Sequence, residues 1–102
     1  RRLQPEVELA LYRIAQEALN NVARHAQASH ASLSLDFNQE VVTLRVTDNG
    51  CGFEVPESPA EMALSGHFGL LGMQERAELV GARLNIKSAR GEGTAVDVNL
   101  TA

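Results

Sequence analysis

Apolar residues recur at three- and four-residue steps along the first quarter of the chain, which is the spacing of one buried helix face. We expect a long amphipathic helix over residues 5–27, and Pro5 suits its first turn because no intrahelical hydrogen bond is lost there. The same spacing returns after Gly69 and stops at Gly81, which is well placed to cap a helix C-terminus. The pattern therefore predicts a second helix between these two glycines.

Apolar and polar residues alternate elsewhere, which is the period of a β-strand. The alternation over residues 33–37 is followed, after a short polar break, by the β-rich run 41–47, so a hairpin with one buried face is expected. Alternation returns at residues 84–86 and 96–100, on either side of the glycine-containing segment 89–93. This region is expected to form a closing hairpin.

The segment 54–68 contains two prolines, two serines and a glycine and has little strand character. We interpret it as a mobile connection with at most a helical turn at residues 60–64. The order helix, two strands, loop, helix, two strands predicts a two-layer α/β sandwich of the α+β type, with helices on one face of a mainly antiparallel sheet. Because 102 residues suffice for one core but not for two ordinary domains, residues 1–102 are expected to form a single domain.

Charge and composition limit the classes of partner that this chain is expected to bind. The net charge is −4, the basic residues are scattered, and only four aromatic residues occur, which argues against nucleic acid as a partner. No apolar run approaches the roughly 20 residues of a membrane span, so no direct membrane contact is expected. The lone Cys51 cannot form an intrachain disulfide, which fits a reducing compartment. The start at Arg1 rather than at a methionine suggests a cytoplasmic domain of a longer protein, with or without a membrane anchor in the parent.

A carboxylate and two alternate glycines follow directly after the second predicted strand, in Asp48-Asn49-Gly50-Cys51-Gly52. Glycines at positions 50 and 52 let the backbone approach a ligand closely, and an ionised Asp48 offers only hydrogen-bond acceptors. An amine-bearing ring such as adenine would fit. The alternative is an ordinary turn, because Asp-Asn-Gly is also common turn chemistry.

Glu17 and Asn21 lie four residues apart and share one face of the first predicted helix, with Arg24 and His25 one turn further on. An amide oxygen at Asn21 is a suitable ligand for Mg²⁺, which prefers oxygen and usually keeps waters and substrate phosphates in its coordination shell. Glu17 would then act through a water or on an attacking group. The alternative interpretation is a solvated polar stripe.

Glycines also end the mobile connection and open the second helix, in Gly66-His67-Phe68-Gly69-Leu70-Leu71-Gly72-Met73. Exposed N–H groups and the positive end of a helix dipole make such a turn an anion site, although glycines also serve as plain hinges. Thr94, which follows Gly93, needs no function as the first residue of a strand.

The order of these segments resembles the GHKL ATPase superfamily. Residues 17–25 (Glu-Ala-Leu-Asn-Asn-Val-Ala-Arg-His) look like its N box, residues 48–52 like its G1 box, and residues 66–70 (Gly-His-Phe-Gly-Leu) like its G2 box. The run 69–77 (Gly-Leu-Leu-Gly-Met-Gln-Glu-Arg-Ala) is similar to the signature of sensor histidine kinases that pair with NarL-type response regulators. The resemblance implies a Bergerat fold with a mainly antiparallel mixed sheet and an ATP lid over residues 54–68.

The resemblance also implies a role for each matching residue. Asp48 would accept the adenine amino group with Thr94 joining through water, Asn21 would coordinate Mg²⁺, and Glu17 would be the catalytic residue that assists the attacking group. The remaining ATP-binding positions would be Arg24, His25, Gly50, Gly52, Gly69, Leu70 and Gly72.

The function implied is that of the catalytic ATP-binding domain of a sensor histidine kinase. It would bind Mg·ATP and donate the γ-phosphate to a histidine on a separate dimerisation domain, with a NarL-type response regulator downstream, so the isolated chain is expected to lack autophosphorylation. The alternatives are another GHKL ATPase, such as an anti-sigma-factor serine kinase, or a nucleotide-binding regulatory module that transfers no phosphate. Two departures from the pattern are a short lid and Gly81-Ala82 in place of a frequent Gly-Gly pair.

Overall fold

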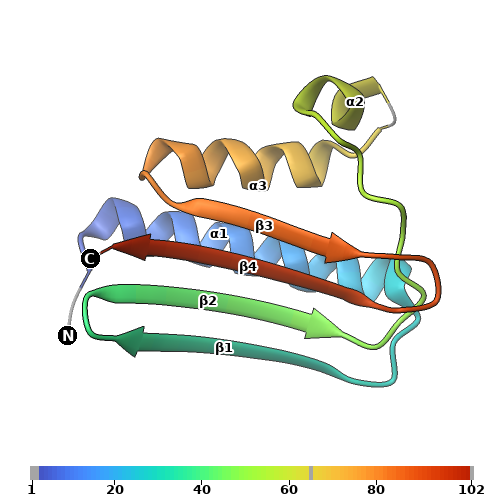
Figure 1. The fold of residues 1–102 in the computed structure, drawn as a ribbon, viewed down its shortest axis with the longest axis horizontal. Helices are drawn as coiled ribbons and strands as arrows, with labels where there is room; N and C mark the ends of the chain where they lie inside the picture. The colour runs from blue at the N-terminus through green and yellow to red at the C-terminus, as the bar shows by residue number, and fades with distance from the viewer. Residues whose placement is uncertain (1–2, 65, 102) are drawn as a thin grey trace.

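Two layers make up the domain, a four-stranded sheet and a layer of helices, as Figure 1 shows. The computed structural model describes residues 3–64 and 66–101. Helix α1 spans Pro5–Asn21 and continues into a wider π-helical turn, η1, at Val22–Ala26. The expected first helix is therefore confirmed, but its last turn is not α-helical, and it ends where Gln27 adopts the left-handed conformation (φ 52°).

The sheet is built from strands β1 (Ala31–Asn38), β2 (Val41–Asp48), β3 (Arg83–Ser88) and β4 (Thr94–Thr101). Their order is β1-β2-β4-β3, and each neighbouring pair is antiparallel. Both predicted hairpins are present. Strand β4 inserts between β2 and β3, so the ends of β2 and β4 that carry Asp48 and Thr94 lie side by side in register.

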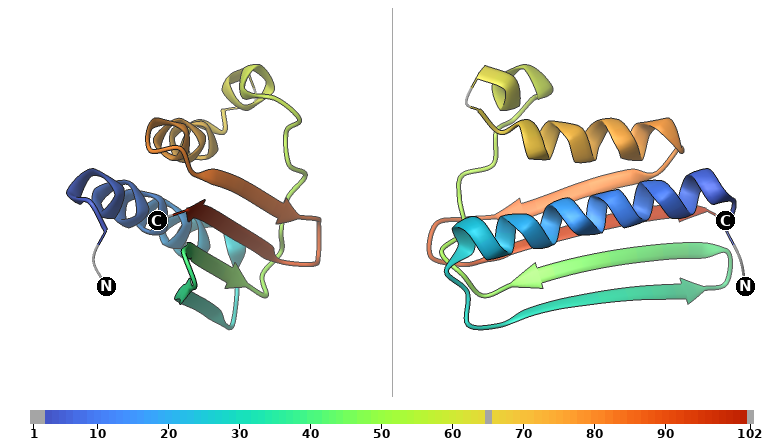
Figure 2. Two further views of the ribbon diagram at one scale, coloured as in Figure 1. Left: turned by 60° about the vertical axis from the view of Figure 1, so that its left-hand side comes forward. Right: turned by 180° about the vertical axis from the view of Figure 1, so that it is seen from behind.

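Helix α3 (Phe68–Leu79) begins close to the position that the glycine pattern predicted, and Gly81 adopts the expected positive φ of 72° after its end. The expected helical turn before it is the short helix α2 (Pro59–Leu64). Helices α1 and α3 pack side by side on the same face of the sheet, as the views of Figure 2 show, whereas α2 stands away from the sheet edge.

The core lies between this helical layer and the central strands. The residues with no measurable exposure come from three elements, Ile14 of α1, Met73 and Ala77 of α3, and Val98 of β4. They are joined by the inward-facing valines and leucine of β2 and by Leu70 of α3. Burying these side chains is the main driving force that holds the two layers together.

The first hairpin does not have the fully buried face that alternation predicted. Helix α1 packs over β2, and the apolar side chains of the edge strand β1 remain substantially exposed, with Leu33 and Leu35 at 47% and Phe37 at 42%. The pattern correctly assigned these residues to the helix side of the sheet, because Leu35 lies opposite the buried Leu44 in the register. Their burial depends on what covers the strand, which alternation does not encode.

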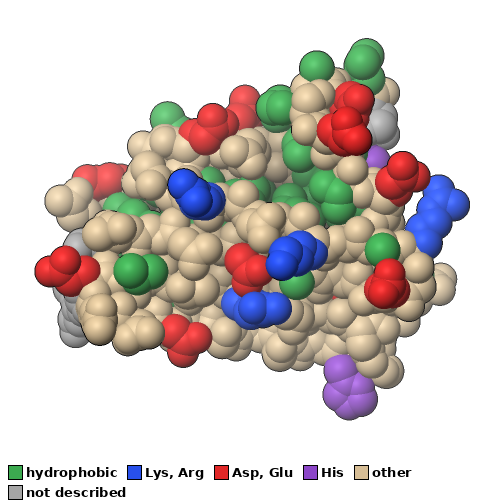
Figure 3. Space-filling view, in the orientation of Figure 1, with side chains coloured by type: hydrophobic (Ala, Val, Ile, Leu, Met, Phe, Trp, Pro, Cys, Tyr) green, Lys and Arg blue, Asp and Glu red, His purple; other side chains and the backbone are tan. Residues whose placement is uncertain are grey.

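The opposite face of the sheet is polar. In Figure 3, which looks at this face, acidic and basic side chains are scattered among uncharged ones. One pair, Arg45 of β2 and Asp97 of β4, approaches to 3.5 Å between Nε and Oδ1 across register partners. This face therefore carries the polar side of the strand alternation.

Candidate functional site

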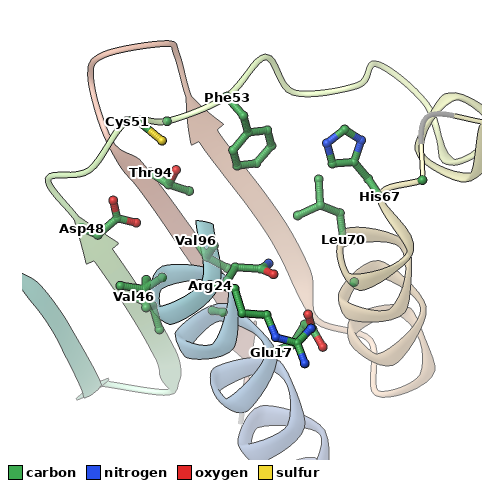
Figure 4. Close-up of a pocket in the computed structure, with 16 residues that line it drawn as sticks. Glu17, Arg24, Val46, Asp48, Cys51, Phe53, His67, Leu70, Thr94 and Val96 are labelled. Atoms are coloured by element: carbon green, nitrogen blue, oxygen red, sulfur yellow. The ribbon is translucent and has the colours of Figure 1, made fainter. Parts of the chain in front are cut away.

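A cavity of about 420 Å³ opens between the end of α1, the start of α3 and the ends of β2 and β4, as Figure 4 shows. This volume falls within the range that proteins use for small-molecule ligands. Its walls combine apolar strand and helix positions with a few polar side chains. The lining residues are Glu17, Ala18, Asn21, Val22, Arg24, Val46, Asp48, Cys51, Gly52, Phe53, Gly66, His67, Gly69, Leu70, Thr94 and Val96.

One end of the cavity carries the carboxylate of Asp48, the last residue of β2. The backbone N–H of Gly50 donates to Oδ1 of Asp48 at 2.7 Å, which fixes the carboxylate in a local Asx turn. The second carboxylate oxygen, Oδ2, can accept a hydrogen bond from a ligand. Thr94, opposite Asp48 in the β2–β4 register, brings its hydroxyl to the same end.

Apolar residues form the middle of the cavity. Val46 and Val96 are register partners on β2 and β4, and both are buried beneath it. At the mouth, the rings of Phe53 and His67 stack with centroids 5.7 Å apart and an interplanar angle of 22°. The two residues lie side by side in Figure 4, and they stand at the two ends of the segment that contains α2. The two valines offer an apolar surface on which a flat ring could lie.

The other end of the cavity is polar and belongs to α1. Glu17 and Asn21 are one helical turn apart and both line the cavity, as does Arg24 in the π-helical turn. The start of α3 lies against the same point, because a Cβ placed on Gly69 would collide with the Glu17 carboxylate. A carboxylate and an amide oxygen on one helix face are a donor set that fits Mg²⁺ when phosphate and water oxygens complete its shell.

Most of the predicted site residues surround this single cavity. Those that line it are Glu17, Asn21, Arg24, Asp48, Gly52, Gly69, Leu70 and Thr94. Gly50 and Gly72 are not among its lining residues: Gly50 is buried behind the Asp48 carboxylate, and a Cβ on Gly72 would lie 3.0 Å from Nη1 of Arg76. The predicted His25 side chain lies outside the described part of the chain.

Sequence reasoning assigned no cavity role to several residues that line it. Val46 and Val96 could have been found from strand alternation, because each lies two residues from Asp48 or Thr94 on the helix side. Phe53 gives no such signal, since its position depends on how the loop after β2 folds against the β3–β4 turn. Cys51, which the sequence marked only as the single cysteine of the chain, is exposed and lines the cavity.

Among the side chains that the structure describes, no three of His, Cys, Asp or Glu cluster in a way that could hold a metal ion. Across residues 3–64 and 66–101, no helix is both long and apolar enough to cross a membrane.

A four-stranded antiparallel sheet covered on one face by two helices, with a cavity between the helix ends and the strand ends, defines a class of α+β ligand-binding domains. Residues 6–102 match the family described as "Histidine kinase-, DNA gyrase B-, and HSP90-like ATPase". The chain belongs to this family, as its N, G1 and G2 boxes predicted.

Curated relatives agree with this assignment. The chain is 36% identical over 99 residues to the signal transduction histidine-protein kinase/phosphatase DegS of Bacillus subtilis, covering 97% of the chain and 25% of DegS. It is 38% identical over 99 residues to the oxygen sensor histidine kinase NreB of Staphylococcus carnosus, covering 97% of the chain and 27% of NreB. The chain thus spans about a quarter of the length of these relatives. Their identity agrees with the branch that the run 69–77 predicted.

Solved structures show the same fold. The histidine kinase domain of the Erythrobacter litoralis EL346 blue-light activated histidine kinase superimposes with a TM-score of 0.74 at 22% identity, covering 94% of the chain and 45% of that structure. The Acinetobacter baumannii histidine kinase AdeS gives a TM-score of 0.72 at 12% identity, covering 91% of the chain and 46% of that structure. The expected α+β sandwich is therefore confirmed, although each described strand pair here is antiparallel rather than mixed.

Proposed function

We propose that this domain binds Mg·ATP as the catalytic domain of a two-component sensor histidine kinase. Family membership and the similarity to DegS and NreB support this function. The γ-phosphate would pass to a histidine on a separate dimerisation domain of the same protein, and from there to a NarL-type response regulator. The domain would act in the cytoplasm, whether or not its parent protein is anchored in a membrane.

The observation that carries the proposal is that one cavity has two chemically different ends. The Asp48 end offers a fixed carboxylate and a hydroxyl, which suit the amino group of adenine. The α1 end offers Glu17 and Asn21 beside the first turn of α3. Between them lies an apolar floor for the ring, so a nucleotide would lie along the cavity with its base at Asp48 and its phosphates toward α1.

At the phosphate end, Asn21 would hold Mg²⁺ through its amide oxygen, and the ion would neutralise phosphate charge during transfer. The N-terminus of α3, at Gly69 and Leu70, presents backbone N–H groups suited to phosphate oxygens. Arg24 could add a positive charge to the same region, and the resemblance assigns His25 there as well. Because phosphoryl transfer depends mainly on positioning and charge neutralisation, these groups would supply most of the catalysis.

The glycines would contribute through their backbone conformation and their lack of a side chain. Gly52 has a φ of 64° and lines the cavity, so the backbone can pass close to the base. Gly50 would act indirectly, because its N–H orients the Asp48 carboxylate. Gly72 would let Arg76 pack across the first turns of α3.

Glu17→Gln tests the catalytic assignment. The variant should bind Mg·ATP within roughly twofold of wild type, yet phosphorylate a supplied histidine-bearing helical domain at least about a hundredfold more slowly, because a neutral amide cannot accept the proton of the attacking imidazole. Glu78→Gln, at an exposed position of α3, is the matched control and should transfer phosphate at the wild-type rate. Unchanged transfer by Glu17→Gln would remove Glu17 from the mechanism.

The same assay separates the alternative functions. An anti-sigma-factor serine kinase would transfer phosphate to a serine and not to the histidine-bearing domain. A regulatory module would bind nucleotide and transfer to neither. Transfer to histidine by the wild-type domain, together with its loss in Glu17→Gln, is the result that the proposed function requires.

A further inference from the structure

Ser88, the last residue of β3, lies at the junction of three parts of the cavity wall, although it is not itself a lining residue. The backbone N–H of Phe53 donates to its Oγ at 2.9 Å. Its Oγ donates to the carbonyl oxygen of Gly93 at 2.9 Å. The same Oγ is 2.8 Å from Oγ1 of Thr94, its register partner on β4.

Counting protons determines the direction of the third hydrogen bond. A serine hydroxyl has one proton and two lone pairs. The Phe53 N–H can only donate and the Gly93 carbonyl can only accept, so the serine proton goes to Gly93, which is buried. The bond between the hydroxyls then requires Thr94 to donate to Ser88.

This arrangement leaves Thr94 with lone pairs only for the cavity. Asp48, opposite Thr94 in the register, also presents only acceptors when it is ionised. This end of the cavity therefore favours a ligand edge that carries hydrogen-bond donors, such as an amino group or a water that relays one. A keto oxygen at the same position would face acceptors on both sides.

The same junction also holds the loop after β2 against the β3–β4 turn. The N–H of Gly91 donates to the carbonyl oxygen of Cys51 at 2.6 Å. A Cβ on Gly52 would collide with the carbonyl oxygen of Ala89, so the two backbones are in close contact. The loop and the turn therefore keep Phe53 and Gly93 in place around Ser88, and turning the Ser88 proton toward Thr94 would break the hydrogen bond to the Gly93 carbonyl.

We propose that Ser88 is a positioning residue that determines nucleotide selectivity, because it takes the Thr94 proton and so keeps the base end of the cavity free of hydroxyl donors. This inference rests on the proposed function, which places the base at Asp48. It assigns Ser88 a role that is separate from holding the fold: without Ser88, the Thr94 hydroxyl is free to donate into the cavity and to tolerate a keto group.

The test is calorimetric titration of wild type, Ser88→Ala, Thr94→Val and the double variant with ATP and with ITP, which carries a 6-keto group in place of the 6-amino group. Ser88→Ala should reduce the preference for ATP over ITP roughly fivefold, the effect of about one hydrogen bond. In the Thr94→Val background the same substitution should leave the preference unchanged, because no threonine hydroxyl remains to reorient. Ser88→Thr, which keeps a hydroxyl, should retain the wild-type preference.

Equal losses of ATP and ITP affinity in Ser88→Ala would show a structural role alone and overturn the inference. An undiminished preference in Ser88→Ala would overturn it as well while leaving the proposed function intact. If the wild-type domain bound neither nucleotide, the proposed function itself would fail, and the selectivity assigned to Ser88 would fail with it.

Discussion

Replacing Gly52 with alanine tests how tightly the loop after β2 closes on the β3–β4 turn. Gly52 has a φ of 64°, and a Cβ there would collide with the carbonyl oxygen of Ala89 and lie 2.9 Å from that of Gly93. Both obstacles are backbone atoms, so neither can move aside by a change of rotamer. Gly91, in the same turn, offers a matched control, because its φ is 82° and a Cβ there would have nothing within 4 Å.

The two substitutions share one cost and differ in another. An L-residue in the left-handed region costs about 1–2 kcal/mol, and both variants carry this penalty. Gly52→Ala adds the cost of forcing an atom into a closed contact, about 1–3 kcal/mol for typical overpacking. We therefore expect the free energy of unfolding to fall by about 1–2 kcal/mol in Gly91→Ala and by about 2–5 kcal/mol in Gly52→Ala.

Urea denaturation followed by circular dichroism measures both values, and each kilocalorie corresponds to a drop in Tm of about 4–8 °C for a domain of this size. The difference between the two variants isolates the collision from the backbone strain. Equal destabilisation would refute the close contact between the loop and the turn, and with it the fixed position of Phe53 and Ser88.

Two further predictions concern the hydrophobic core and the proposed Mg²⁺ ligand. Leu44→Ala should lower the free energy of unfolding by about 2–5 kcal/mol in urea denaturation. Leu35 is the exposed residue opposite Leu44 in the hairpin, and Leu35→Ala should lower it by about 1 kcal/mol or less. Equal losses would contradict the difference in burial. Asn21→Ala should weaken ATP binding about tenfold more in Mg²⁺ than in EDTA when titrated by calorimetry, and Asn20→Ala, on the exposed neighbouring position, should have no such effect. A loss that is the same with and without metal would exclude Asn21 as the ligand.

Periodicity predicted the elements of this fold well, because the same burial that creates the pattern also stabilises the helices and strands. The spacing before Gly81 corresponds to α3, and the alternation around residues 33–37 corresponds to β1. The exposure of β1 was not predictable, since alternation shows which side of a strand is apolar but not whether another element covers it. The apolar spacing likewise does not indicate the π-helical turn after Asn21.

The residues of the candidate site likewise include some that the sequence could reveal and others that it could not. Asp48 could be singled out because two alternate glycines follow it directly after a strand, and Asn21 because it lies one helical turn from Glu17. The resemblance to the GHKL superfamily then assigned their roles, and both residues line the cavity. Phe53 and Ser88 could not be singled out, because their positions depend on contacts between segments about 35 residues apart in the chain. Such contacts are set by the closing of the loop onto the turn, which no local pattern records.

Measuring nucleotide binding with and without the Asp48 carboxylate is the most direct test of the proposed adenine site. Calorimetric titration of the wild-type domain should show clear preference for ATP over GTP, and Asp48→Ala should lower ATP affinity about tenfold to a hundredfold, as expected for loss of a hydrogen bond to a charged group. Asp36→Ala, on the exposed edge strand, should bind ATP as wild type does. Equal affinity of the wild-type domain for ATP and GTP, or unchanged ATP binding in Asp48→Ala, would contradict the assignment.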